Sequence, residues 1–169
     1  MDIIFIRNHS ELGNMIKKAS IIKKLSEQKL KLTQQRMAII EAFLDNVSLH
    51  PGARRIYEEA RKKVRSLSLS TVYAALNEFS RHGIIKMLEF DKMENRYEGN
   101  IAAHINLVCK GCNKIMDYKP PISIDLKAVA KKARFRVTDT RLEYYGYCQK
   151  CKKQKPTHGQ VREKGEGEK

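Results

Sequence analysis

The chain has 169 residues, enough for one domain of ordinary size or two small ones, and 41% of them are hydrophobic, which excludes a disordered chain. Its apolar start, residues 3–6, falls far short of the ~20 apolar residues that span a bilayer. The formal charge of +15 favours a polyanionic partner, nucleic acid first, although a lysine-rich surface kept for solubility would give the same value.

The first 98 residues predict helices followed by a β-hairpin. Residues 1–19 carry little information and form an N-terminal extension, and from residue 20 apolar side chains recur at helical spacing. Thr33 and Ser68 are placed to cap helices, Pro51 to open one and Gly83 to end one. The predicted elements are a short helix lined by Ile21, Ile22, Leu25 and Leu30, helices at 34–46, 52–64 and 69–82, and strands at 84–90 and 96–98. This order is typical of a winged helix-turn-helix domain, here residues 20–98.

Residues 99–151 differ in character and predict a second, smaller α/β unit. Strands at 104–109 and 114–118 precede a helix at 123–134 and a strand at 135–147. Residues 152–169 are charged and lack large apolar side chains, so we interpret them as a disordered tail. The predicted fold class is therefore α+β, with a winged helix-turn-helix domain followed by a small α/β domain.

Four cysteines form two Cys-x-x-Cys pairs within this second unit: Cys109, Cys112, Cys148 and Cys151. No signal peptide is recognisable, so we expect a cytoplasmic protein with reduced thiols, which favours metal ligands over disulfides. Four thiolates suit one tetrahedral structural Zn²⁺ per chain, and iron in a rubredoxin-like site is the minor alternative. Such a closed site has no open position for catalysis, and its loss should unfold the unit.

The helix at 69–82 is the predicted DNA-reading element. Val72, Leu76 and Phe79 form its apolar stripe, and small polar side chains occupy the other side. Hydroxyl and amide groups near a helix N-terminus suit phosphates and base edges in a major groove, although an ordinary amphipathic helix shows the same pattern. The candidate DNA contacts from this segment are Ser68, Ser70, Thr71, Tyr73 and Asn77.

Residues 20–151 resemble the ferric uptake regulator superfamily, which includes iron, zinc, manganese and nickel sensors and a peroxide sensor. The matching stretches, in family order, are LKLTQQRMAIIEAF, HPGARRIYEEA, SLSTVYAALNEFSRHGIIKML, RYEGNIAAHINLVCKGCNKIMDY and RLEYYGYCQKC. The resemblance implies a homodimeric, metal-responsive repressor that binds a double-stranded, palindromic operator through its winged helix and dimerises through residues 99–151. Lys31 and Arg36 are further candidate contacts to the DNA backbone or minor groove, and the resemblance supports Lys31 through the family's LK-x-T segment.

The resemblance further implies a regulatory metal site at the hinge between the two domains. Position by position, this site falls on His50, Glu98, His104, Asn106 and Asp117. Such a nitrogen and oxygen set suits Fe²⁺, Mn²⁺ or Zn²⁺. Asn106 stands where the iron and peroxide branches usually have a third histidine, and an amide oxygen is the weaker ligand. In the alternative interpretation, His50 caps a helix and His104 is a half-buried strand residue.

The sequence predicts no enzyme and no small-molecule substrate. The thiolates belong to a closed site, and we find neither a phosphate-binding glycine loop nor a nucleophile with a matching base. The predicted function is transcriptional repression in metal homeostasis or the oxidative-stress response, and the stimulus itself stays open. The alternative is a zinc-ribbon protein that contacts nucleic acid or a transcription complex without sensing metal.

Overall fold

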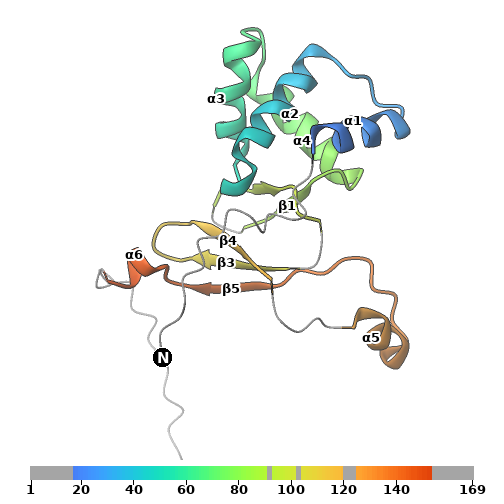
Figure 1. Ribbon diagram of the computed structural model, residues 1–169, viewed down its shortest axis with the longest axis vertical. Helices are drawn as coiled ribbons and strands as arrows, with labels where there is room; N and C mark the ends of the chain where they lie inside the picture. The colour runs from blue at the N-terminus through green and yellow to red at the C-terminus, as the bar shows by residue number, and fades with distance from the viewer. Residues whose placement is uncertain (1–16, 91–92, 102–103, 120–124, 154–169) are drawn as a thin grey trace, which may run out of the picture. The chain divides into compact units, whose positions relative to one another are not determined.

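The computed structural model describes residues 17–90, 93–101, 104–119 and 125–153, and the chain divides into two compact units (Figure 1). The first unit ends at residue 102 and the second begins at residue 103. The predicted extension and tail lie almost wholly outside the described residues. Within those residues, no helix combines the length and apolar character needed to cross a membrane.

The described part of the first unit contains helices followed by a two-stranded hairpin. Its elements are α1 (Lys18–Glu27), α2 (Gln34–Asn46), the short 3-10 helix η1 (Val47–Leu49), α3 (Ala53–Lys63), α4 (Leu69–Arg81), β1 (Lys86–Leu88) and β2 (Arg96–Glu98). The two strands are antiparallel, with Met87 opposite Tyr97. This is the predicted order of a winged helix-turn-helix. The prediction of a strand over 84–90 was too long, since only residues 86–88 pair with β2.

Local signals set the ends of the helices. The Thr33 hydroxyl accepts a hydrogen bond from the Arg36 N–H at 3.2 Å, and the Ser68 hydroxyl accepts one from the Thr71 N–H at 3.1 Å, which confirms both predicted caps. Gly83 takes the left-handed conformation (φ 60°) just after α4 and ends it as predicted. The prediction for the third helix was early by one residue: α3 begins at Ala53, so Pro51 lies before the helix.

One apolar cluster holds the first unit together. Phe43 of α2, Phe79 of α4 and Tyr97 of β2 are each at most 2% exposed. The predicted stripe of α4 is buried, and Leu30 packs against the cluster although it lies beyond the end of α1. The helices and the hairpin therefore form one packed body around a shared core.

The N-terminus of α3 is capped by a side chain from the loop between β1 and β2. Its own cap residue, Gly52, has no side chain, and the Arg54 N–H donates to Glu94 Oε1 at 3.0 Å instead. A Cβ at Gly52 would lie 2.3 Å from Glu94 Oε2, so the glycine leaves room for the carboxylate. A carboxylate here satisfies a helix N–H group and complements the helix dipole.

We expect Glu94→Ala to lower the free energy of unfolding of the first unit by about 1 kcal/mol, because α3 loses its cap. Gly52→Ala should cost a similar amount, since the added methyl group displaces the same carboxylate. The double variant should therefore be little worse than either single variant. Chemical denaturation followed by circular dichroism measures all three, and additive losses would contradict this account.

The second unit contains a three-stranded sheet in the strand order β4-β3-β5. β3 (Ile105–Cys109) is antiparallel to β4 (Ile115–Tyr118) and parallel to β5 (Glu143–Gly146). Two helices complete it, α5 (Leu126–Ala133) and the unpredicted α6 (Gln149–Lys152). The prediction of a strand over 135–147 was wrong in length, because residues 135–142 have no strand pairing.

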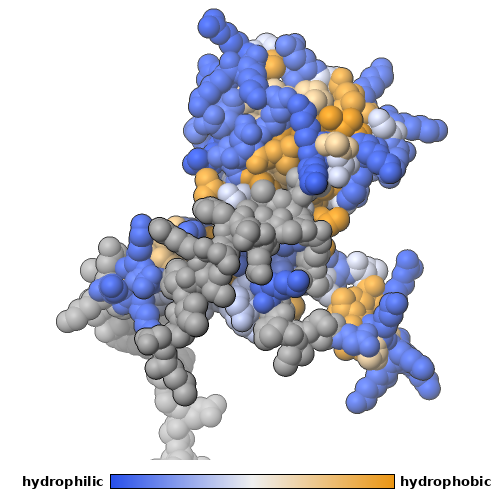
Figure 2. Space-filling view, viewed as in Figure 1, coloured by the Kyte–Doolittle hydropathy of each residue, from blue (hydrophilic) through white to orange (hydrophobic). Residues whose placement is uncertain are grey.

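The helix α5 has an apolar side that the described residues leave exposed. Leu126 and Val129 are 36% and 46% exposed, Phe135 just beyond the helix is 66% exposed, and no residue of α5 is buried. Figure 2 shows the hydrophobic colour over this helix, between charged side chains. An isolated helix of eight residues is marginal in water, so this side favours a further packing partner.

Candidate metal centres and nucleic-acid interface

The four predicted zinc ligands come from two short turns of the second unit. Cys109 ends β3 and Cys112 lies in the turn that follows, while Cys148 precedes α6 and Cys151 lies within it. Asn113 closes the first turn in a left-handed conformation (φ 56°), with its N–H donating to the Cys109 carbonyl at 2.8 Å. The register of β3 with β5 brings the two turns to the same end of the sheet.

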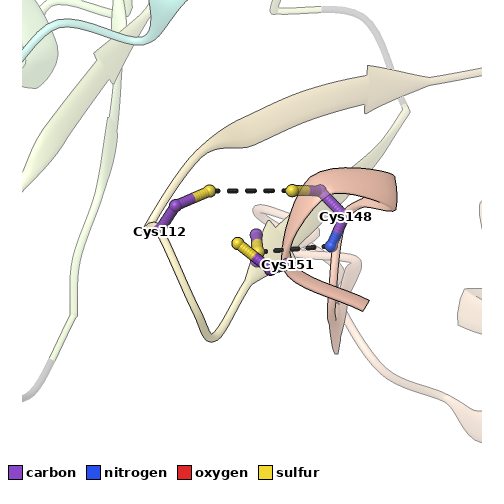
Figure 3. Close-up of side chains that lie close together, drawn as sticks. Cys112, Cys148 and Cys151 are labelled. Atoms are coloured by element: carbon purple, nitrogen blue, oxygen red, sulfur yellow. Dashed lines mark hydrogen bonds between the residues drawn. The ribbon is translucent and has the colours of Figure 1, made fainter. Parts of the chain in front are cut away.

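The sulfur geometry fits a tetrahedral metal ion. All four Sγ atoms lie within 4.8 Å of one another, and Cys112 Sγ is 3.8 Å from Cys148 Sγ (Figure 3). Zinc with Zn–S bonds of about 2.3 Å holds sulfurs about 3.8 Å apart. A Cβ at Gly111 would lie 2.9 Å from Cys151 Cβ, so this glycine permits the close approach of the turns.

Backbone N–H groups favour the thiolate at two of the four cysteines. The Cys148 N–H donates to Cys109 Sγ at 3.2 Å and lowers the pKa of the Cys109 thiol to about 6. A backbone N–H of Cys151 likewise lowers the pKa of Cys148, whereas the hydrogen bond with Cys148 raises the pKa of the Cys151 thiol to about 12. These backbone N–H groups therefore favour the thiolate, the form that binds metal, at Cys109 and Cys148.

Two of the predicted regulatory ligands form a buried pair in the first unit. His50 Nε2 lies 3.7 Å from Glu98 Oε2, and the side chains are 3% and 2% exposed. His50 follows η1 in a left-handed conformation (φ 48°), and the Tyr97 N–H donates to the carbonyl of the next residue, Pro51, at 3.0 Å. The end of β2 thus fixes both partners.

Three other predicted ligands lie together in the second unit. His104 Nε2 is 3.8 Å from Asp117 Oδ1, and Asn106 is buried on β3 directly opposite Asp117 on β4. Two ligands that bind one ion at about 2.1 Å lie roughly 3–4 Å apart, so the nitrogen–oxygen spacing in both pairs suits metal ligation. Each unit therefore holds one histidine–carboxylate pair of the predicted set.

The outer side of α4 carries the candidate base contacts. Ser70 and Asn77 are exposed on it, together with Ala74 and Arg81 at helical spacing. Tyr73 is half-buried and packs against the core of the first unit, so its ring also has a structural role. Ser68 caps the helix, and its hydroxyl lies 2.8 Å from that of Thr71.

A groove of about 630 Å³ lies between the segment before α2 and the side of α4. Three of the predicted DNA contacts line this groove: Lys31, Arg36 and Thr71. The Lys31 side chain is exposed. Arg36 donates to the Lys31 carbonyl at 2.8 Å and pairs with Glu78, which fixes its guanidinium at the groove. The sequence reasoning missed two cations there, Lys29 and Arg81. Four cations against the single carboxylate of Glu78 leave the groove positive.

Comparison with known proteins identifies the family. The sequence model of the ferric uptake regulator family matches residues 27–145. The chain is 35% identical over 130 residues to the peroxide operon regulator of Bacillus subtilis. The aligned segment covers 76% of this chain and 89% of that protein. The chain belongs to the ferric uptake regulator family.

Solved structures of metal uptake regulators share its fold. A zinc-bound manganese uptake regulator is 27% identical to this chain and superposes on it with a TM-score of 0.57. The superposition covers 76% of this chain and 98% of the regulator's chain. The Helicobacter pylori ferric uptake regulator superposes with a TM-score of 0.67 over 82% of this chain and 96% of its own, at 24% identity. The predicted fold class, a winged helix-turn-helix domain before a zinc-site α/β domain, is confirmed.

As a ferric uptake regulator family member, the protein is a metal-responsive transcriptional repressor for metal homeostasis or the oxidative-stress response. Its relatives are transcriptional regulators rather than enzymes. The four-cysteine cluster suits a structural zinc, and the histidine and carboxylate ligands suit a regulatory divalent metal. This family membership argues against the alternative of a zinc-ribbon protein with no metal response.

Proposed function

We propose that the protein is a homodimer that binds a palindromic operator when Fe²⁺, Mn²⁺ or Zn²⁺ occupies the regulatory site. The ligands of this ion would be His50, Glu98, His104, Asn106 and Asp117. The observation that carries the proposal is the histidine–carboxylate pair in each unit, spaced 3.7 and 3.8 Å. We further propose that the protein works in the cytoplasm, where its operator DNA is.

Metal binding would act on DNA binding through the orientation of the units. Each pair belongs to one unit, so an ion that takes ligands from both pairs links them and restricts their relative rotation. In a homodimer this restriction sets the separation of the two α4 helices, which must match major grooves about 34 Å apart. The metal therefore favours the DNA-binding arrangement through contacts that other arrangements lack.

The second unit offers the surface for the homodimer. The apolar side of α5 is exposed, and β5 is an edge strand that pairs only with β3 in the described sheet. A second copy of this unit would cover the apolar side chains and extend the sheet, which addresses both features at once.

The hinge proposal is tested by one histidine from each unit. In the zinc-loaded wild type, we expect Mn²⁺ or anaerobic Fe²⁺ to strengthen operator binding by about 10- to 100-fold. In His50→Ala and His104→Ala, the same ions should change it by less than about 3-fold, because each unit's pair is incomplete. The exposed His82→Ala is the matched control. A full metal response in either site variant would contradict the proposal, provided that each chain retains one zinc.

The 35% identity to a peroxide operon regulator favours iron as the regulatory metal and peroxide as the signal. In the same titrations, hydrogen peroxide should abolish operator binding of the Fe²⁺-loaded protein and leave the Mn²⁺-loaded protein unchanged, since Mn²⁺ is far less readily oxidised. Equal persistence of both complexes in peroxide would instead favour metal sensing.

The DNA contacts are tested on the outer side of α4. Asn77→Ala should weaken operator binding by roughly 10-fold, the loss of one base-edge contact, without changing the melting temperature, because Asn77 is exposed. Tyr73→Phe separates the hydroxyl contact from the packing of the ring, which the variant keeps. Ser26→Ala, exposed on α1, is the control. Fluorescence anisotropy with labelled operator gives the affinities, and unchanged binding in both α4 variants would show that another face reads the DNA.

A further inference from the structure

A row of polar residues crosses the sheet of the second unit. The register places Asn106 of β3 opposite Asp117 on β4 and also opposite Glu143 on β5. Residues directly opposite one another in a sheet point to the same face. The row therefore reads Asp117, Asn106, Glu143, with the amide between two carboxylates. Glu143 lies outside the predicted ligand set.

The Glu143 carboxylate is held in place by its own strand. Arg141 Nε donates to Glu143 Oε1 at 2.5 Å, and the Tyr145 hydroxyl donates to Glu143 Oε2. Glu143 and Tyr145 alternate along β5 and so share one of its faces, and Arg141 lies two residues before the strand. The Glu143 side chain is only 9% exposed. A carboxylate that is enclosed and held by both oxygens has little freedom to move toward a distant ion.

The spacing of the strands argues against Glu143 as a direct ligand of the ion beside Asp117. Neighbouring strands are 4.7–4.9 Å apart, so the backbones of Asp117 and Glu143 are separated by roughly 9–10 Å across β3. An ion between His104 and Asp117, whose ligand atoms lie 3.8 Å apart, stays on the far side of Asn106. The guanidinium of Arg141 beside the Glu143 carboxylate also repels a cation.

We propose that Glu143 is a positioning residue that acts through Asn106. Asp117 and Glu143 are both carboxylates that can only accept hydrogen bonds, so the ion decides which way the amide turns: with a cation beside His104 and Asp117, the amide NH₂ of Asn106 faces Glu143. The amide oxygen then faces Asp117 and His104, where it binds the regulatory ion. A carboxylate behind a ligand fixes its orientation and strengthens it as a donor, as behind metal-bound histidines. The inference rests on the proposed regulatory site and explains how a weak amide ligand serves there.

Mn²⁺ binding to the zinc-loaded, full-length protein tests the proposal by isothermal titration calorimetry. Glu143→Gln should weaken Mn²⁺ binding by about 10-fold, since its amide can turn the Asn106 side chain the wrong way. Tyr144→Phe, on the opposite face of β5, should leave the affinity unchanged. Tyr145→Phe frees one carboxylate oxygen and should weaken binding by a smaller factor, which keeps the test open if Glu143→Gln folds poorly.

A double-variant cycle separates positioning from a general loss of structure. In the Asn106→Ala background, Glu143→Gln should change Mn²⁺ affinity by less than about 2-fold, because the residue through which it acts is absent. An equal loss in both backgrounds would overturn the positioning role. So would Mn²⁺ binding that depends on His104 and ignores Glu143→Gln. Mn²⁺ binding that is insensitive to His104→Ala would instead overturn the regulatory site itself, and this inference with it.

Discussion

Removal of zinc should unfold the second unit and leave the first unit folded. The described part of the second unit buries few apolar side chains, among them Ile105, Val108 and Ile115, and its helices bury none. The zinc ligands connect the turn after β3 to α6. Structural zinc in finger peptides contributes about 10–16 kcal/mol of apparent binding free energy, which is comparable to or larger than the stability of a typical domain.

Cys148→Ser provides the test, with zinc content and hydrogen exchange as the measurements. We expect less than one zinc per chain and a loss of amide protection over residues 104–119 and 143–153. Protection in α2 and α4 should stay high, because their core is complete within the first unit. Chelation of the wild type followed by zinc addition is the control, and it should reverse the loss. Full protection of β3 in the metal-free protein would refute a folding role for zinc.

Phe43→Ala should have the opposite effect, destabilising the first unit by about 3–5 kcal/mol while zinc stays bound. The Phe43 ring is 2% exposed in the cluster that joins the helices to the hairpin, so its removal leaves a cavity. Since whole domains are stable by about 5–15 kcal/mol, operator binding should fall sharply near physiological temperature.

Urea denaturation followed by the helical circular dichroism signal measures this loss, and zinc analysis reports on the second unit. Leu49→Ala removes a large apolar side chain from a position of the first unit that is 52% exposed, and it should leave the helical transition unchanged. Loss of zinc together with the helices in Phe43→Ala would mean that the two units unfold as one cooperative block.

Features set by a few neighbouring residues could be predicted from the sequence. The caps at Thr33 and Ser68, the glycine after α4 and the apolar stripe of that helix are all local, since each depends on contacts within one or two turns. The prediction of a long strand over 135–147 was wrong because the extent of a strand depends on residues far away in the chain. Strand pairing needs a partner, and β5 pairs only with residues 106–109 of β3.

The candidate sites show the same difference between features set by neighbouring residues and features set by distant ones. The zinc ligands were predicted from the spacing of the cysteines, whereas the regulatory ligands came only from the family resemblance. The place of Glu143 beside Asn106 depends on the register between distant segments, which no local pattern encodes. The basic groove likewise includes Lys29, just after α1, and Arg81, at the end of α4, and only the fold brings these two residues together.

The left-handed backbone at His50 has a consequence for metal affinity at the proposed regulatory site. A residue with a side chain pays roughly 1 kcal/mol or more for this conformation, and the surrounding structure must enforce it. The imidazole is therefore preorganised: its orientation is settled when the first unit folds and need not be settled again when an ion arrives. Substitutions that relax this bend could then retune the metal threshold of the repressor while every ligand stays in the chain.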